Sequence, residues 1–207
     1  LGRAGTLKAV EGFSPEIVVV YTSTPSIYND CSVAGEIKDL LPSCFVVLTG
    51  PHVSALPVES LALDSRVDAV ARGEYDLTIA ELAERLAGKG GLDNVSGLTY
   101  RDGETIISNP DRAFIEDLDS LPFVSRVYKK HLNIRNYFYA HCRYPVVSIF
   151  TSRGCNARCA YCVYPEKMFG RRQRQRSPEN IVSEFEYIEK ELPEVKEVLI
   201  DDDTFSF

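Results

Sequence analysis

Apolar and polar residues follow two different spacings along the first half of the chain, and their succession predicts alternating strands and helices. Short apolar runs rich in β-branched residues, at 17–21, 44–48 and 67–71, are typical of parallel strands buried on both faces. The spacing of apolar residues between and after these runs predicts helices over 32–41, 58–63 and 77–87. This order predicts an α/β fold built on a doubly wound parallel sheet.

The pattern changes after this sheet. Residues 97–107 place Asp-Gly between two β-prone runs, which predicts a hairpin. Beyond it, residues 109–144 mix acidic residues with scattered apolar ones, as expected of a connector. A strand at 146–150, a helix capped by Ser177 and a strand at 195–200 then form one βαβ unit. We therefore predict a domain over 1–108, a connector over 109–144 and the start of a partial β/α barrel over 145–207.

Three closely spaced cysteines, Cys155, Cys159 and Cys162, follow the strand at 146–150 in the pattern C-x3-C-x2-C. Three thiolates with no fourth ligand nearby indicate a metal centre with an open coordination position. A structural zinc site would need a fourth ligand, and a redox dithiol would leave Cys155 unexplained. An iron–sulfur centre is therefore favoured. The other cysteines are expected to be buried or half-buried thiols that act as small hydrophobic residues: Cys31, Cys44 and Cys142.

Small and polar residues follow each predicted strand of the first sheet. The loops are Thr22–Pro25, Thr49–His52 and Arg72–Glu74. Because ligands bind beyond the carboxyl ends of parallel strands, these loops together predict a ligand site, although each alone is also typical of an ordinary turn. No G-x-G-x-x-G or Walker loop occurs, so a dinucleotide or nucleoside triphosphate is not indicated.

Composition narrows the function classes. The chain has 207 residues, 44% hydrophobic and 26% charged, with a net charge of −7, which argues against a general nucleic-acid binder. No apolar run of about 18 residues or more occurs, and no signal peptide opens the sequence, so a cytoplasmic protein without a membrane span is expected. Both ends look cut, since the first sheet lacks an opening strand and a full barrel needs about 200 residues or more.

The run from Arg153 to Cys162 resembles the signature of the radical S-adenosylmethionine (SAM) superfamily. The resemblance implies that the three cysteines hold a [4Fe-4S] cluster whose fourth iron binds SAM, and that Tyr161 lies against the adenine. Asp202 and Asp203 resemble a motif that meets the amino group of SAM in one subgroup. A solvated strand end is the plainer interpretation of these acids.

The first half of the chain resembles the cobalamin-binding domain fused to many of these enzymes. The resemblance implies that cobalamin contacts Thr22, Ser23, Thr24, Thr49, Gly50, Pro51, His52 and Glu74. The Ser-x-Leu and Gly-Gly elements of related domains are each altered here. The element that supplies the lower cobalt ligand in some relatives is absent, so that ligation stays open.

The resemblance as a whole implies a fragment, by itself inactive, of a cobalamin-dependent radical SAM enzyme. It implies methyl transfer, ring formation or rearrangement on a small-molecule substrate, with an external electron donor such as flavodoxin or ferredoxin. Two alternatives stay open. A methylthiotransferase would need three further cysteines for a second cluster, and a non-catalytic metal-binding or electron-transfer module would hold the cluster without SAM.

Overall fold

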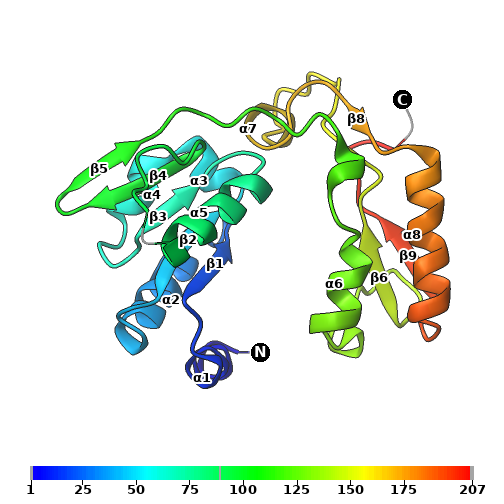
Figure 1. Ribbon diagram of the computed structural model, residues 1–207, viewed down its shortest axis with the longest axis horizontal. Coiled ribbons are helices and arrows are strands. Elements are labelled where there is room, and N and C mark those ends of the chain that lie inside the picture. Colours follow the sequence, from blue (N-terminus) through cyan, green and yellow to red (C-terminus); the bar gives the residue numbers. More distant parts are fainter. Residues whose placement is uncertain (1, 89, 206–207) are drawn as a thin grey trace. The chain divides into compact units, whose positions relative to one another are not determined.

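The computed structural model describes residues 2–88 and 90–205, which form two compact units (Figure 1). The first unit comprises residues up to Phe114 together with Glu166–Met168. The second comprises Ile115–Pro165 and the residues from Phe169 onward. The predicted connector therefore contributes residues to both units, most of them to the second.

A five-stranded mixed sheet forms the centre of the first unit, with strand order β1-β2-β3-β4-β5. The first three strands pair in parallel and are β1 (Ile17–Tyr21), β2 (Phe45–Thr49) and β3 (Ala69–Ala71). The predicted hairpin is confirmed as β4 (Leu98–Asp102) and β5 (Thr105–Ser108), and it pairs antiparallel to β3. The α/β class is thus confirmed, with a parallel-rich sheet that ends in an antiparallel hairpin.

Helices cover both faces of this sheet. Residues of α1 (Arg3–Phe13), α2 (Ile27–Leu40), α3 (Pro51–Ala55) and α4 (Pro57–Ala62) pack into one core with Val46 and Leu48 of β2. Residues of α5 (Asp76–Gly88) pack into a second core with Val47 of the same strand. Because neighbouring strand residues point to opposite faces, a strand covered on both sides must be apolar throughout.

The second unit contains a parallel pair, β6 (Val146–Ile149) with β9 (Glu197–Ile200), joined through α8 (Pro178–Glu191). The Ser177 hydroxyl accepts a hydrogen bond from Asn180 N at 3.1 Å, as expected of an N-cap, and Pro178 occupies the first turn. A short antiparallel pair joins β7 (Ser152–Arg153) to β8 (Arg174–Gln175). The predicted βαβ unit is thus present, and it carries the cysteine loop after its first strand.

The remaining elements show where sequence pattern was insufficient. Helix α2 begins at Ile27, five residues before the predicted start at 32. Helix α3, which follows β2, was not predicted from the sequence. The region predicted as a connector contains η1 (Leu118–Ser120), α6 (Val124–His131) and η2 (Ile134–Asn136). The four-residue α7 (Tyr164–Lys167) lies after the cysteine loop. Among the described residues, no helix is long and apolar enough to cross a bilayer.

Candidate functional site

Parallel pairing brings the carboxyl ends of β1, β2 and β3 to one edge of the first sheet, and the predicted loops meet there. Thr22 N donates to the Thr49 carbonyl at 2.8 Å, and the buried Thr49 hydroxyl donates to the Ala71 carbonyl at 3.1 Å. Thr24 Oγ1 and His52 Nδ1 lie 3.1 Å apart. These contacts link the three strand ends into one polar edge.

Gly50 allows the ends of β1 and β2 to lie this close. Its φ is 114° and its ψ 179°, a conformation that is essentially confined to glycine. A Cβ at this position would lie 2.2 Å from the Thr22 carbonyl oxygen. The buried Pro51 then begins α3, so the chain turns at once away from the sheet edge.

Some of the polar side chains at this edge are buried. Thr22 is 1% exposed, and its hydroxyl has no hydrogen-bond partner within the part of the chain that the structure describes. Glu74, beyond β3, is 4% exposed. The hydroxyls of Ser23 and Ser26 lie 3.1 Å apart. A buried hydroxyl without a partner costs free energy that a bound ligand could offset, so Thr22 marks where a ligand group would fit.

Ser54 is a residue of this edge that the sequence pattern did not single out. Its hydroxyl donates to the Gly50 carbonyl at 2.7 Å and accepts from Gly73 N at 2.9 Å. It also lies 3.5 Å from the Met168 sulfur. Ser54 thereby ties the loop after β2 to the loop after β3. The available signal was its position four residues after Gly50, where a serine in a helix can bond the preceding turn.

The cysteine loop of the second unit begins at a turn that requires glycine. Gly154 has a φ of 89°, and a Cβ there would lie 2.4 Å from the Arg172 carbonyl oxygen. Next to it, Cys155 N donates to the Gly170 carbonyl at 3.3 Å. The start of the loop is therefore held against the segment that leads into β8.

The three cysteines share this loop but differ in exposure. Cys155 is buried, Cys162 is half-buried and Cys159 is exposed, and Cys162 N donates to the Cys159 carbonyl at 3.2 Å. Tyr161 between them is 91% exposed. Within residues 2–88 and 90–205, no three His, Cys, Asp or Glu side chains are grouped for a metal ion. The donors nevertheless fit a cluster, because three thiols lie within eight residues of irregular chain.

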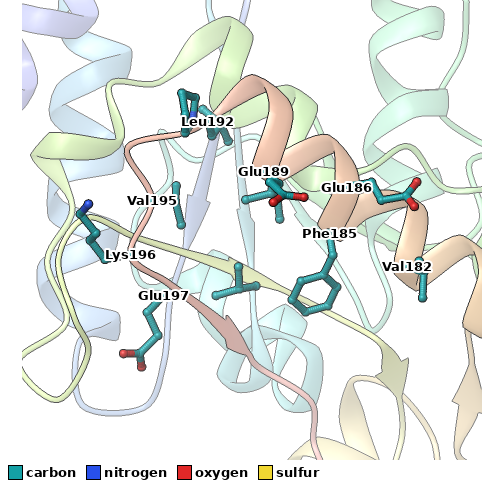
Figure 2. A pocket seen from close by; sticks show the side chains of 11 residues that line it. Val182, Phe185, Glu186, Glu189, Leu192, Val195, Lys196 and Glu197 are labelled. Atoms are coloured by element: carbon teal, nitrogen blue, oxygen red, sulfur yellow. The ribbon is translucent and has the colours of Figure 1, made fainter.

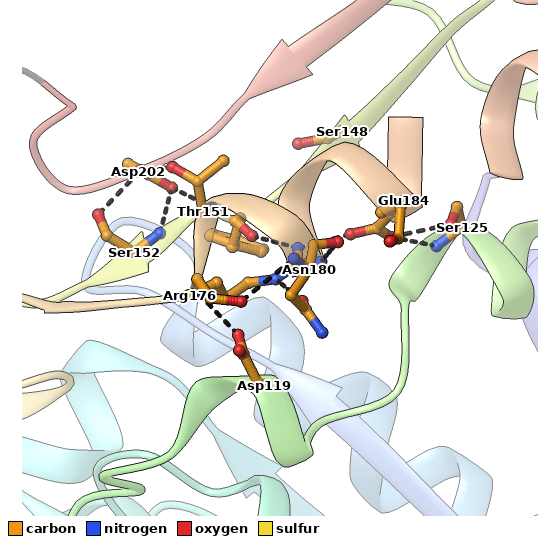
Figure 3. Close-up of polar contacts among 12 residues, drawn as sticks. Asp119, Ser125, Ser148, Thr151, Ser152, Arg176, Asn180, Glu184 and Asp202 are labelled. Carbon is orange, nitrogen blue, oxygen red and sulfur yellow. Dashed lines mark hydrogen bonds and ion pairs between the residues drawn. The ribbon is translucent and has the colours of Figure 1, made fainter. Parts of the chain in front are cut away.

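Asp202 and Asp203 lie beyond β9, at the same edge as the cysteine loop, but their environments differ. Asp202 accepts from Thr151 N at 2.7 Å, from Ser152 N at 3.1 Å and from both hydroxyls of these residues (Figure 3). Asp203 accepts from Gly154 N at 2.9 Å. Burial raises the pKa of the Asp203 carboxyl above its usual value, against the Gly154 amide, which lowers it.

The second unit also contains a groove that lies away from these residues. Figure 2 shows a groove between α8 and β9, with Val182, Phe185 and Val195 on its walls and Glu186 and Glu189 along the helix. None of the predicted site residues lines it. The groove therefore plays no part in the predicted chemistry.

The fold and the loops at the two sheet edges can now be compared with known proteins. One unit is a parallel-rich sheet with a buried polar edge, and the other is a βαβ unit that carries three cysteines beyond a strand. Residues 149–205 match the Radical SAM superfamily, so the chain carries a radical SAM segment.

Two known relatives are similar to this chain well beyond residues 149–205. An uncharacterized methyltransferase, PH0819, of Pyrococcus horikoshii is 31% identical over 199 residues, which cover 96% of this chain and 42% of that protein. The anaerobic magnesium-protoporphyrin IX monomethyl ester cyclase of Synechocystis is 29% identical over 160 residues, covering 77% of this chain and 31% of that protein.

Among solved structures, the cobalamin-dependent SAM radical enzyme OxsB, with aqua-cobalamin and SAM bound, superposes with a TM-score of 0.73 at 17% identity. The match covers 98% of this chain and 27% of OxsB. The predicted resemblance to radical SAM proteins with a cobalamin-binding domain is confirmed. The chain spans less than half the length of each of these relatives.

Proposed function

We propose that this chain is part of a radical SAM enzyme in which Cys155, Cys159 and Cys162 hold a [4Fe-4S] cluster. The observation that carries the proposal is the placement of these thiols on one loop beyond β6, at the same edge as the acids beyond β9. Active sites of β/α barrels collect at this edge, and we infer that the βαβ unit is the start of such a barrel.

For SAM, we propose that Asp203 rather than Asp202 meets the amino group. Asp202 already accepts hydrogen bonds from two backbone amides and two hydroxyls, whereas among the described residues Asp203 accepts from the Gly154 amide alone. A carboxylate with unused acceptor positions suits an ammonium group. We assign the exposed Tyr161 to the adenine, as its place in the motif implies.

The first unit is proposed to bind cobalamin at the polar edge of its sheet, through the eight residues from Thr22 to Glu74 named above. The buried hydroxyl of Thr22, which has no partner among the described residues, supports a ligand there. We infer that this sheet is of the doubly wound type, since helices cover both of its faces.

When bound, the cluster and SAM supply a carbon-centred radical by one-electron cleavage, and cobalamin supplies a methyl group. The residues of this chain would orient the cofactors and exclude water. The electron would come from an external protein donor such as flavodoxin or ferredoxin. Free thiols persist in a reducing compartment, so we place the protein in the cytoplasm.

Methyl transfer is the reaction we favour, because PH0819 is described as a methyltransferase, and ring formation on a small molecule is the second candidate, from the cyclase. A methylthiotransferase is disfavoured, because Cys31 and Cys44 are buried in the core of the first unit while Cys142 belongs to the second.

Anaerobic reconstitution of the full-length protein with iron, sulfide and cobalamin tests the proposal. We expect cluster absorption, an electron paramagnetic resonance signal that changes when SAM is added, and one bound cobalamin. A cluster signal that ignores SAM would refute the radical assignment. Cluster formation without cobalamin binding would refute only the proposal that the first unit binds cobalamin.

A further inference from the structure

A fully buried carboxylate lies between α6 and α8 in the second unit (Figure 3). Glu184 of α8 is 0% exposed. One of its carboxylate oxygens accepts from Ser125 N at 3.1 Å and from the Ser125 hydroxyl at 2.8 Å. The other oxygen pairs with the guanidinium of Arg176. One buried charge therefore joins the start of α6 to the segment just before α8.

Arg176 also binds the end of β6. Its Nη1 donates to the Phe150 carbonyl at 2.8 Å, and its backbone N donates to the Thr151 carbonyl at 2.9 Å. Its Nε donates to Asn180 Oδ1 at 2.7 Å, and its guanidinium lies 5.4 Å from the centre of the Phe123 ring. The side chain is only 10% exposed, so each of its donors is directed at a fixed partner.

Two side chains therefore hold the root of the cysteine loop, which we define as residues 150–152. Arg176 binds the carbonyl oxygens of Phe150 and Thr151, and Asp202 binds the amides and hydroxyls of Thr151 and Ser152. Cys155 follows three residues after Ser152. Any movement of this root would change where the thiolates present the cluster to SAM.

We propose that Arg176 and Glu184 are positioning residues for the radical chemistry: they fix the root of the cysteine loop without touching cluster or SAM. The inference rests on the proposed function. Stability alone does not account for the pair, because two apolar side chains of similar size can replace a buried ion pair at little cost. Apolar side chains cannot hold the Phe150 carbonyl in place.

The same argument designs the test. In the full-length protein, the double variant Arg176→Met with Glu184→Met removes the side-chain hydrogen bonds, including the one to the Phe150 carbonyl, without leaving an unpaired buried charge. The backbone hydrogen bond from residue 176 to the Thr151 carbonyl is retained. The matched control, Lys190→Met with Glu191→Met, removes an ion pair at the end of the same helix. Its partners lie 3.8 Å apart, and Lys190 is exposed while Glu191 is half-buried. Arg176→Lys keeps the charge opposite Glu184 but loses the planar fork of donors.

For each variant we would measure the iron content, the thermal unfolding midpoint, KM for SAM and the rate of SAM cleavage per cluster. We expect the double variant and Arg176→Lys to assemble the cluster yet cleave SAM about 10-fold more slowly, because small misplacements of reacting groups cost this much or more. KM for SAM should change little, and the control should match the wild type.

A double variant that assembles the cluster and cleaves SAM at the control rate would overturn the inference. If the double variant does not fold, Arg176→Lys decides, and wild-type cleavage by that variant overturns the inference. A wild-type protein that forms no SAM-responsive cluster would instead refute the proposed function, so the two failures are distinguishable.

Discussion

Replacing Gly50 by alanine tests whether the polar edge of the first sheet depends on close approach of β1 and β2. The φ of 114° and ψ of 179° cost a residue with a Cβ about 1–3 kcal/mol. The new Cβ would also lie 2.2 Å from the Thr22 carbonyl oxygen, and relieving such overpacking costs about 1–3 kcal/mol more. We therefore expect a loss of about 2–6 kcal/mol in unfolding free energy.

Gly103→Ala is the matched control in the same sheet. Gly103 also has a positive φ, 59°, but a Cβ there meets no atom within 4 Å, so only the backbone term of about 1–2 kcal/mol applies. Urea unfolding followed by circular dichroism compares the two variants, and equilibrium titration with aquacobalamin measures binding. Gly50→Ala should lose both stability and cobalamin binding. If it is no less stable than Gly103→Ala, the close approach at Thr22 does not constrain this edge.

Further predictions concern single side chains. Cys159→Ala should abolish cluster absorption, whereas Cys44→Ala, a buried thiol of the first core, should leave it intact. Asp203→Asn should raise KM for SAM with little change in stability. Asp202→Asn should instead lower the unfolding free energy by about 1–3 kcal/mol, because it weakens four hydrogen bonds to the carboxylate. Equal effects of the two variants on KM would contradict the assignment of Asp203 to SAM. Burial raises the pKa of Cys31 to about 11, so its thiol stays neutral below that pH. At pH 8 only about 0.1% is thiolate, and mass spectrometry should show alkylation of Cys31 far slower than that of the exposed Cys159 in the cluster-free protein.

Local patterns predicted the elements whose signals are strong over a few residues. The strands at β1 and β2 are continuous apolar runs because both of their faces are covered, and Asp102-Gly103 marks the hairpin turn. By contrast, α6 follows a proline-containing stretch and has few buried residues, so its sequence did not stand out from a connector. Its position depends on Ser125 meeting Glu184, a contact between residues 59 positions apart.

The sequence by itself determined which residues are candidates for the chemistry of this protein. The spacing of Cys155, Cys159 and Cys162 is a local property of eight residues, and the strand before them predicts which edge of the fold they reach. Tertiary structure alone decided how that loop is held. The different hydrogen bonds of Asp202 and Asp203, and those of Arg176 at the end of β6, arise from contacts between distant segments. No local pattern encodes such contacts, because hydrogen bonding depends on position in space rather than on position along the chain.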